Sequence, residues 1–143
     1  MPSKKANDAD NQQERLKTAY WIVGFTDGGG TFSVSKIKNS TTKSGYQIFP
    51  EFVITQGAKS LKALEKIQMF FRCGKVYINK RYDNHREHLY RYCVRSRKDL
   101  NEKIIPFFNQ NKLQTAKIKD FIRFCKVIGQ MNKGEHLKAD YSL

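Results

Sequence analysis

Residues 20–32 read Tyr20-Trp-Ile-Val-Gly-Phe-Thr-Asp-Gly-Gly-Gly-Thr-Phe32, and this stretch decides how the chain is organised. Apolar side chains recur at helical spacing up to it and predict a helix from about Glu14 to Thr26. Three glycines follow Asp27. Because glycine weakens a helix interior and is favoured at a C-cap, we expect the helix to end there. Polar and apolar side chains then alternate, which predicts a strand over Thr31–Lys38.

Two glycines in the stretch, Gly24 and Gly28, are four residues apart and therefore lie on one side of the predicted helix. Small residues at this spacing let a second helix backbone approach closely. A lone pair of this kind can also serve packing within one subunit. The 143 residues hold one copy of the stretch, so we expect a homodimer in which the helices of two chains pack side by side. The expected interface is Tyr20, Val23, Gly24, Asp27 and Gly28.

The rest of the chain predicts two hairpins separated by a helix. Three further strands are expected over Gln47–Gln56, Lys75–Arg81 and Leu89–Arg95. Three further helices are expected over Leu61–Phe71, with Ser60 as N-cap, over Asp99–Asn109, with a kink at Pro106, and over Ala116–Met131, with Ile118 and Ile122 on its apolar side.

The order α-β-β-α-β-β-α-α cannot consist of βαβ units throughout. We therefore predict an α+β subunit, in which a curved, antiparallel, four-stranded sheet carries helices on one face and leaves the other face open. One domain is expected over residues 14–133. Residues 1–13 are expected to be a disordered tail, and residues 134–143 a second tail.

The charge balance points to a polyanionic partner. Lys and Arg number 27 against 13 acids, for a net charge of +14 and a pI of about 9.8. Nucleic acid is the usual partner of such a protein, with an anionic membrane surface or simple solubility as alternatives. No apolar run is long enough to cross a membrane, and the positive charge lies mainly on predicted strands, so we expect no membrane partner. Without a signal-peptide core or paired cysteines, we expect a protein of the bacterial cytoplasm or of an organelle, not a secreted one.

The second predicted hairpin concentrates this charge. Residues 72–98 contain nine Lys or Arg and two acids. On an open sheet face, Arg and Lys can neutralise phosphates, while Arg, Asn and Gln can read base edges in the major groove. The candidate binding residues on the two hairpins are Ser33, Ser35, Lys36, Lys38, Asn39, Thr42, Lys43, Gln47, Tyr77, Asn79, Arg81, Arg86, Arg91 and Arg95. The alternative is an ordinary solvated sheet face that is rich in arginine. His85 and His88 could form a metal pair, but a loop histidine that contacts phosphate, or nothing, is the better interpretation.

The opening stretch resembles the LAGLIDADG motif of homing endonucleases, which commonly reads G-F-x-D-G-(D/E)-G-x-F. Residues 24–32 match every fixed position of that pattern except Gly29. The segments Pro50–Gln56 and Glu102–Phe108 and the order of elements also resemble the family, over roughly residues 14–133. The resemblance implies an intron-encoded, homodimeric enzyme that cuts a long, pseudo-palindromic DNA duplex on the open face of its sheet.

The resemblance also implies a site for Mg²⁺ at the end of the motif. In the family the last motif acid binds the metal, assisted by a neighbouring backbone carbonyl. These positions are Gly29, which has no carboxylate, and Gly28; Asp27 has a more structural place. Gln56 matches a glutamine that positions water. A basic residue that supports the transition state aligns loosely with Gln114, and Lys112 or Lys117 could serve instead.

We therefore expect a site-specific DNA endonuclease subunit whose Mg²⁺-dependent cleavage is impaired by Gly29. The alternative is a non-enzymatic nucleic-acid binder on the same scaffold, either a repressor or an intron maturase.

Overall fold

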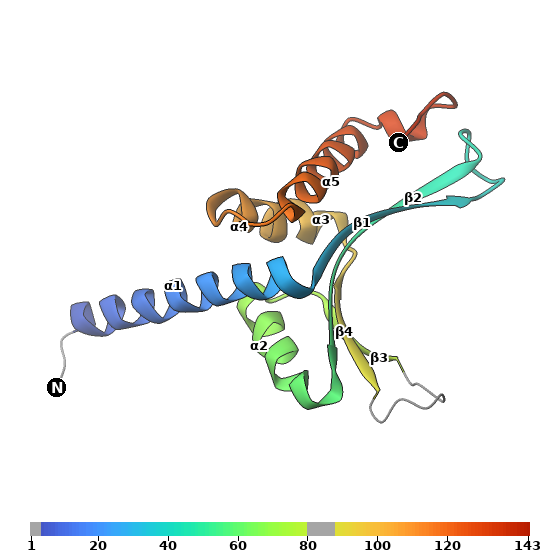
Figure 1. Ribbon diagram of the computed structural model, residues 1–143. Helices are drawn as coiled ribbons and strands as arrows, with labels where there is room; N and C mark the ends of the chain where they lie inside the picture. Colours follow the sequence, from blue (N-terminus) through green and yellow to red (C-terminus); the bar gives the residue numbers. More distant parts are fainter. Residues whose placement is uncertain (1–3, 80–87) are drawn as a thin grey trace.

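The computed structural model describes residues 4–79 and 88–143, in which two pairs of strands are separated and flanked by helices (Figure 1). The strands are β1 (Gly30–Lys38), β2 (Tyr46–Gly57), β3 (Lys75–Asn79) and β4 (Leu89–Val94). The main helices are α1 (Lys4–Gly29), α2 (Leu61–Phe71), α4 (Ile105–Gln110) and α5 (Lys117–Asn132). Shorter helical pieces are η1 (Ala58–Ser60), α3 (Arg97–Asp99), the π-helix η2 (Leu100–Ile104) and η3 (Glu135–Leu137). No helix in the described ranges is long and apolar enough to span a membrane.

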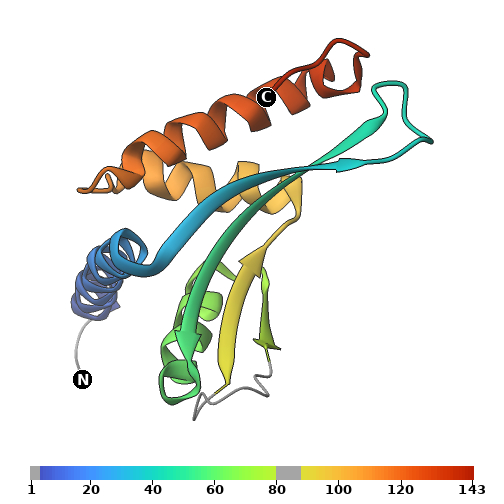
Figure 2. The ribbon, with the colours of Figure 1, turned by 45° about the vertical axis from the view of Figure 1, so that its right-hand side comes forward.

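The four strands form one antiparallel sheet in the order β1-β2-β4-β3. The sheet is strongly curved, and the helices lie on its convex side, which leaves the concave side open (Figures 1 and 2). This arrangement confirms the predicted α+β architecture with helices on one face.

An aromatic cluster fills the space between the sheet and the helices. The ring of Phe32 on β1 lies 5.0–5.5 Å from the rings of Phe52, Phe108, Phe121 and Phe124. All five side chains are buried. Burial of one such side chain contributes on the order of 2–3 kcal/mol. The cluster therefore fixes β1, and with it the end of α1, against α4 and α5.

Helix α1 differs from its prediction at both ends. It begins at Lys4 rather than Glu14, so residues 4–13, which we expected to be disordered, are helical. That segment reads KKANDADNQQ: its Lys, Ala and Gln residues favour helix, but it has no apolar periodicity to detect. At the other end, the helix continues through Gly28 and Gly29, and neither these glycines nor Gly30 has the positive φ of a glycine C-cap.

The other differences concern helix detail. The helix expected over Asp99–Asn109 widens into a π-helical turn before Pro106, which cannot donate the backbone hydrogen bond of a regular helix. Ser60 occupies the N-cap of α2 without a side-chain hydrogen bond. Ile118 and Ile122 are exposed, because α5 turns Phe121, Phe124 and Ile128 toward the sheet instead.

Candidate nucleic-acid interface and motif site

The exposed side of α1 is open around the two motif glycines. A Cβ on Gly24 or on Gly28 would meet nothing within 4 Å, and the neighbouring Tyr20 is 69% exposed. The structure thus places these three predicted interface residues on the surface. Val23 is different, because it is 8% exposed and packs in the core of its own subunit.

Asp27, also predicted at the interface and as a metal ligand, is hydrogen-bonded to the segment that leads into α5. Its carboxylate accepts hydrogen bonds from the backbone N–H of Gln114 (2.9 Å) and of Thr115 (3.2 Å) and from the Thr115 hydroxyl (2.8 Å). Burial would raise the pKa of Asp27, but these bonds and the charge of Lys117 outweigh burial and lower the pKa. The arrangement supports the structural place expected for this acid.

Gly29 lies directly beside Gln56, the residue expected to position water. A Cβ built on Gly29 would stand 3.3 Å from Gln56 Nε2. Since the backbone at Gly29 is not left-handed, a larger side chain is compatible with its conformation and would point toward this amide. Gly29 and Gln56, which the sequence related only through the family resemblance, are therefore neighbours in the structure.

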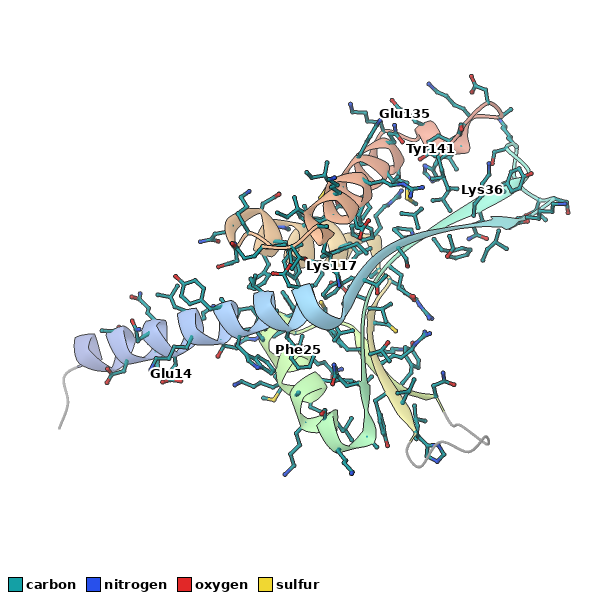
Figure 3. The ribbon with its side chains drawn as sticks, viewed as in Figure 1. Glu14, Phe25, Lys36, Lys117, Glu135 and Tyr141 are labelled. Atoms are coloured by element: carbon teal, nitrogen blue, oxygen red, sulfur yellow. The ribbon has the colours of Figure 1, made fainter. Side chains whose placement is uncertain are left out.

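Among the three candidates for the basic position, Lys117 is the one whose side chain reaches the motif (Figure 3). Its Nζ donates to Thr26 O at 3.0 Å and also to Gly30 O, at the point where α1 becomes β1. Lys112 is exposed, and the side-chain amide of Gln114 donates to Lys112 O at 2.9 Å. Geometry thus separates Lys117 from the other two candidates.

The side chains around the motif end do not fit Mg²⁺. This ion prefers anionic oxygen ligands and gives up its water reluctantly. Gly28 and Gly29 offer only carbonyls, and the Asp27 carboxylate is already engaged by Gln114 and Thr115. Within residues 4–79 and 88–143, no group of three or more His, Cys, Asp or Glu could hold a metal ion. The described side chains at the motif end therefore offer no free carboxylate to a metal ion.

The concave face of the sheet carries seven of the fourteen predicted binding residues. In the strand register, Ser33 pairs with Glu51, Ser35 with Phe49, and Tyr77 with Arg91, and all of these alternate with the core-facing residues. By the same alternation, Gln47, Asn79 and Arg95 belong to this face. Lys36 and Lys38 have the opposite parity; Lys36 Nζ lies 4.2 Å from the centroid of the Tyr46 ring. On the first hairpin, the predicted lysines and the predicted serines therefore lie on opposite faces of the sheet.

The remaining candidates lie in loops. Asn39 Nδ2 donates to Gln47 Oε1 at 3.1 Å, and the Thr42 hydroxyl donates to Asn39 O and Tyr46 O, so the loop between β1 and β2 is internally bonded. Lys43 is exposed in that loop. Arg81, Arg86 and His85, together with the turn over residues 82–85, fall outside the described residues.

The sequence of this chain matches a known family over most of its length. The profile described as LAGLIDADG endonuclease covers residues 22–128, which include the motif, the sheet and most of α5. The chain belongs to the LAGLIDADG endonuclease family. The resemblance inferred from residues 24–32 is thereby confirmed.

Individual LAGLIDADG proteins are similar in sequence and in structure. A probable intron-encoded DNA endonuclease of Mycosarcoma maydis is 37% identical over 71% of this chain and 33% of its own length. The DNA endonuclease I-CeuI of Chlamydomonas moewusii is 25% identical over 93% of this chain and 61% of its own length. The chain spans a third or less of the first three curated relatives it matches.

Two solved LAGLIDADG structures show the same fold. The homing endonuclease I-TnaI matches with a TM-score of 0.74 and 38% identity, over 84% of this chain and 77% of that one. The meganuclease I-SmaMI, bound to uncleavable DNA, matches with a TM-score of 0.77 and 31% identity, over 85% of this chain and 40% of that one.

Sequence reasoning did not single out Glu51, a charged residue on the concave face of this LAGLIDADG chain. Glu51 on β2 forms an ion pair with Arg95, and the Arg95 guanidinium lies 5.4 Å from the centroid of the Tyr77 ring. The hydrogen bond and the charge of Glu51 raise the pKa of Arg95. A glutamate at an open-face position, as the one acid of its strand, was the available signal.

Proposed function

We propose that this chain is a site-specific double-stranded DNA-binding subunit of homing endonuclease type, and that it cuts DNA poorly because its motif acid is missing. The observation that carries the proposal is the open, concave sheet face with Arg91, Arg95, Tyr77 and Gln47 on it. The fold match to I-SmaMI, which is bound to DNA in its solved structure, supports DNA as the partner.

We further propose that two motif helices pair across the exposed side of α1. Gly24 and Gly28 leave this side open for a second backbone, and the exposed Tyr20 and Leu16 extend it along the helix. A pair of identical chains has two-fold symmetry, so its preferred duplex would be pseudo-palindromic. Pairing would also bring the two motif ends, each with Gly29, Gln56 and Lys117, close to one stretch of duplex.

Weak cleavage is proposed because the motif end has no free carboxylate. Lys117 and Gln56 retain positions where they can donate hydrogen bonds to phosphate oxygens or to water. These groups can bind and orient, but they do not replace the anionic ligands that Mg²⁺ needs. This chain would thus retain DNA binding while its Mg²⁺-dependent cleavage is weak.

The cationic sheet face without a motif acid also favours a second candidate. This is a nucleic-acid binder with no enzymatic role, such as a repressor or an intron maturase that holds RNA. The cationic face is present and only the motif acid is absent, which is the combination expected of such a protein. The relatives' description as intron-encoded supports a gene within an intron and the organellar alternative for its location.

Selection from a random-sequence DNA duplex library tests the proposal. The protein should enrich a long pseudo-palindrome, bind it with an affinity that falls steeply as salt rises, and leave it largely uncut in Mg²⁺. Preference for intron RNA over the selected duplex would favour the maturase reading. An affinity that does not change between low and physiological salt would contradict both candidates.

A further inference from the structure

Arg91 on β4 and Arg95, which directly follows β4, have different partners on the concave face. Arg91 Nη2 donates to Cys93 Sγ at 3.6 Å, a weak contact with a neutral thiol. Arg95 instead is paired with the Glu51 carboxylate. Among the described residues, no carboxylate is paired with Arg91. In a complex with DNA, Arg91 would therefore offer an unpaired positive charge, whereas the charge of Arg95 is already balanced by Glu51.

The pair is built into the sheet rather than formed by chance between mobile side chains. Phe52 pairs with Val94 in the register of β2 and β4, so the next position places Glu51 opposite Arg95. The Glu51 side chain is only 20% exposed, and the Tyr77 ring supports the guanidinium from β3. Arg95 keeps an exposed fraction of 54%, so its outer edge remains available to a ligand.

From this arrangement we infer that Glu51 is a specificity-determining residue, which turns Arg95 away from phosphate and toward a base pair in the major groove. This inference rests on the proposed DNA-binding function. A phosphate that approached Arg95 would also approach the Glu51 carboxylate, and the two anions repel each other. A base edge carries no net charge. Arginine can donate two hydrogen bonds to guanine O6 and N7, while a glutamate can accept one from cytosine N4.

The surroundings of the pair suit a base edge. A hollow on this face is lined by Ser35, Ile37, Phe49, Pro50, Glu51, Arg91 and Arg95. Its apolar walls, Ile37 and Phe49, are 52% and 41% exposed. Apolar side chains beside a positioned ion pair can contact the hydrophobic edge of a base, such as a thymine methyl, but give nothing to phosphate. The free Arg91 at the rim is the candidate for the neighbouring phosphate contact.

The test compares wild type, Glu51→Gln, Arg95→Lys and Arg91→Ala on the duplex that the wild type selects from a random library. Every position of that duplex is then varied in turn. Wild type should prefer G·C or C·G at one position in each half-site by about five- to hundred-fold, and Glu51→Gln and Arg95→Lys should both lose this preference at the same position. Arg91→Ala should weaken all sequences alike and reduce the salt slope by about one.

The salt slope gives a readout that a purely structural role would not move. In Glu51→Gln the freed Arg95 becomes able to contact phosphate, so the slope should steepen by about one. Glu65→Gln removes the same charge from an exposed position on α2 and should change neither the slope nor the preference. Since glutamine keeps the size of glutamate and can still accept a hydrogen bond from Arg95, Glu51→Gln should fold normally, which thermal unfolding will verify.

The outcomes separate this inference from the proposed function. If wild type selects a duplex and Glu51→Gln keeps every base preference and the same slope, the inference is wrong and DNA binding stands. If wild type selects no duplex, the proposed function fails and the inference fails with it.

Discussion

The side-chain amide of Gln56 faces the backbone of Gly29, with Nε2 3.3 Å from the point where a Cβ on residue 29 would stand. The two residues come from different elements, the end of α1 and the end of β2. A carboxylate introduced at position 29 would therefore begin next to an amide donor and near the Lys117 ammonium. A carboxylate at position 29 should therefore restore cleavage.

Gly29→Glu should raise Mg²⁺-dependent cleavage of the selected duplex well above that of the unchanged chain. The added carboxylate supplies the anionic oxygen that Mg²⁺ requires, and the Gln56 side chain needs to move by only a few tenths of an ångström. Nicking and double-strand cleavage are measured in single-turnover assays. Gly29→Gln has the same size without the charge and should remain as weak as the unchanged chain. Equal rates for the unchanged chain and Gly29→Glu would show that position 29 is not the metal position.

In the Gly29→Glu background, Lys117→Met should lower the cleavage rate by more than ten-fold, while Lys112→Met should leave it nearly unchanged. Of these two lysines, Lys117 is the one whose side chain contacts the motif, through Thr26 O and Gly30 O. Removal of a positioned cation near a phosphate commonly costs this much or more. Duplex affinity is measured in parallel, because a loss of binding alone would mean that Lys117 holds the scaffold rather than assisting cleavage.

Gly24→Leu should break the proposed pairing of α1 helices. The position is open in the single chain, so the leucine costs little there, but it would hold two backbones apart. Sedimentation or light scattering at micromolar concentration should show a monomer, and affinity for the full palindrome should drop toward that for a half-site. Lys62→Leu adds similar apolar bulk to the exposed surface of α2 and should not change the mass. A wild-type monomer that binds the palindrome tightly would contradict pairing.

The lowered pKa of Asp27 predicts that the folded protein loses stability as the pH falls. Its pKa is lower in the folded protein than in the unfolded chain, so its stabilisation is complete above the unfolded value of about 4 and is lost as pH falls through the folded value. Asp27→Asn should lower the free energy of unfolding at pH 7 by about 1–2 kcal/mol and should flatten its decline below about pH 5. Urea unfolding between pH 3 and 7 measures both. Asp10→Asn, on an exposed part of α1, should follow the unchanged chain.

Two glycine-to-alanine changes should move stability in opposite directions. A Cβ on Gly30 would stand 2.7 Å from Thr26 Cγ2 and 3.1 Å from Thr26 O, so Gly30→Ala should destabilise by about 1–3 kcal/mol. A Cβ on Gly129, inside α5, would meet nothing within 4 Å. Gly129→Ala should therefore stabilise by about 0.5–1 kcal/mol through helix propensity. Thermal unfolding of both variants checks the pair, and a stable Gly30→Ala protein would mean that the junction of α1 and β1 can relax.

The sequence predicted the parts of this molecule that depend on local patterns. Alternation located β1 and β2, and the helical spacing of Leu64, Ile67 and Phe71 located α2. The polar start of α1 carries no such pattern, and its helix was missed. In the site, the motif identified Gly29 and Gln56, yet no pattern could choose among Lys112, Gln114 and Lys117. That choice depends on how α5 packs against α1, as does the engagement of Asp27 with Thr115.

Under the proposed DNA-binding function, the length of β2 limits how many base pairs one chain can contact. Its 12 residues extend for about 40 Å, which corresponds to about twelve base-pair steps. A symmetric pair could thus inspect a stretch of roughly twice that length, long enough to be rare by chance in a genome. A shortened β1–β2 hairpin should contract this footprint from its outer ends while it leaves the centre of the site unchanged.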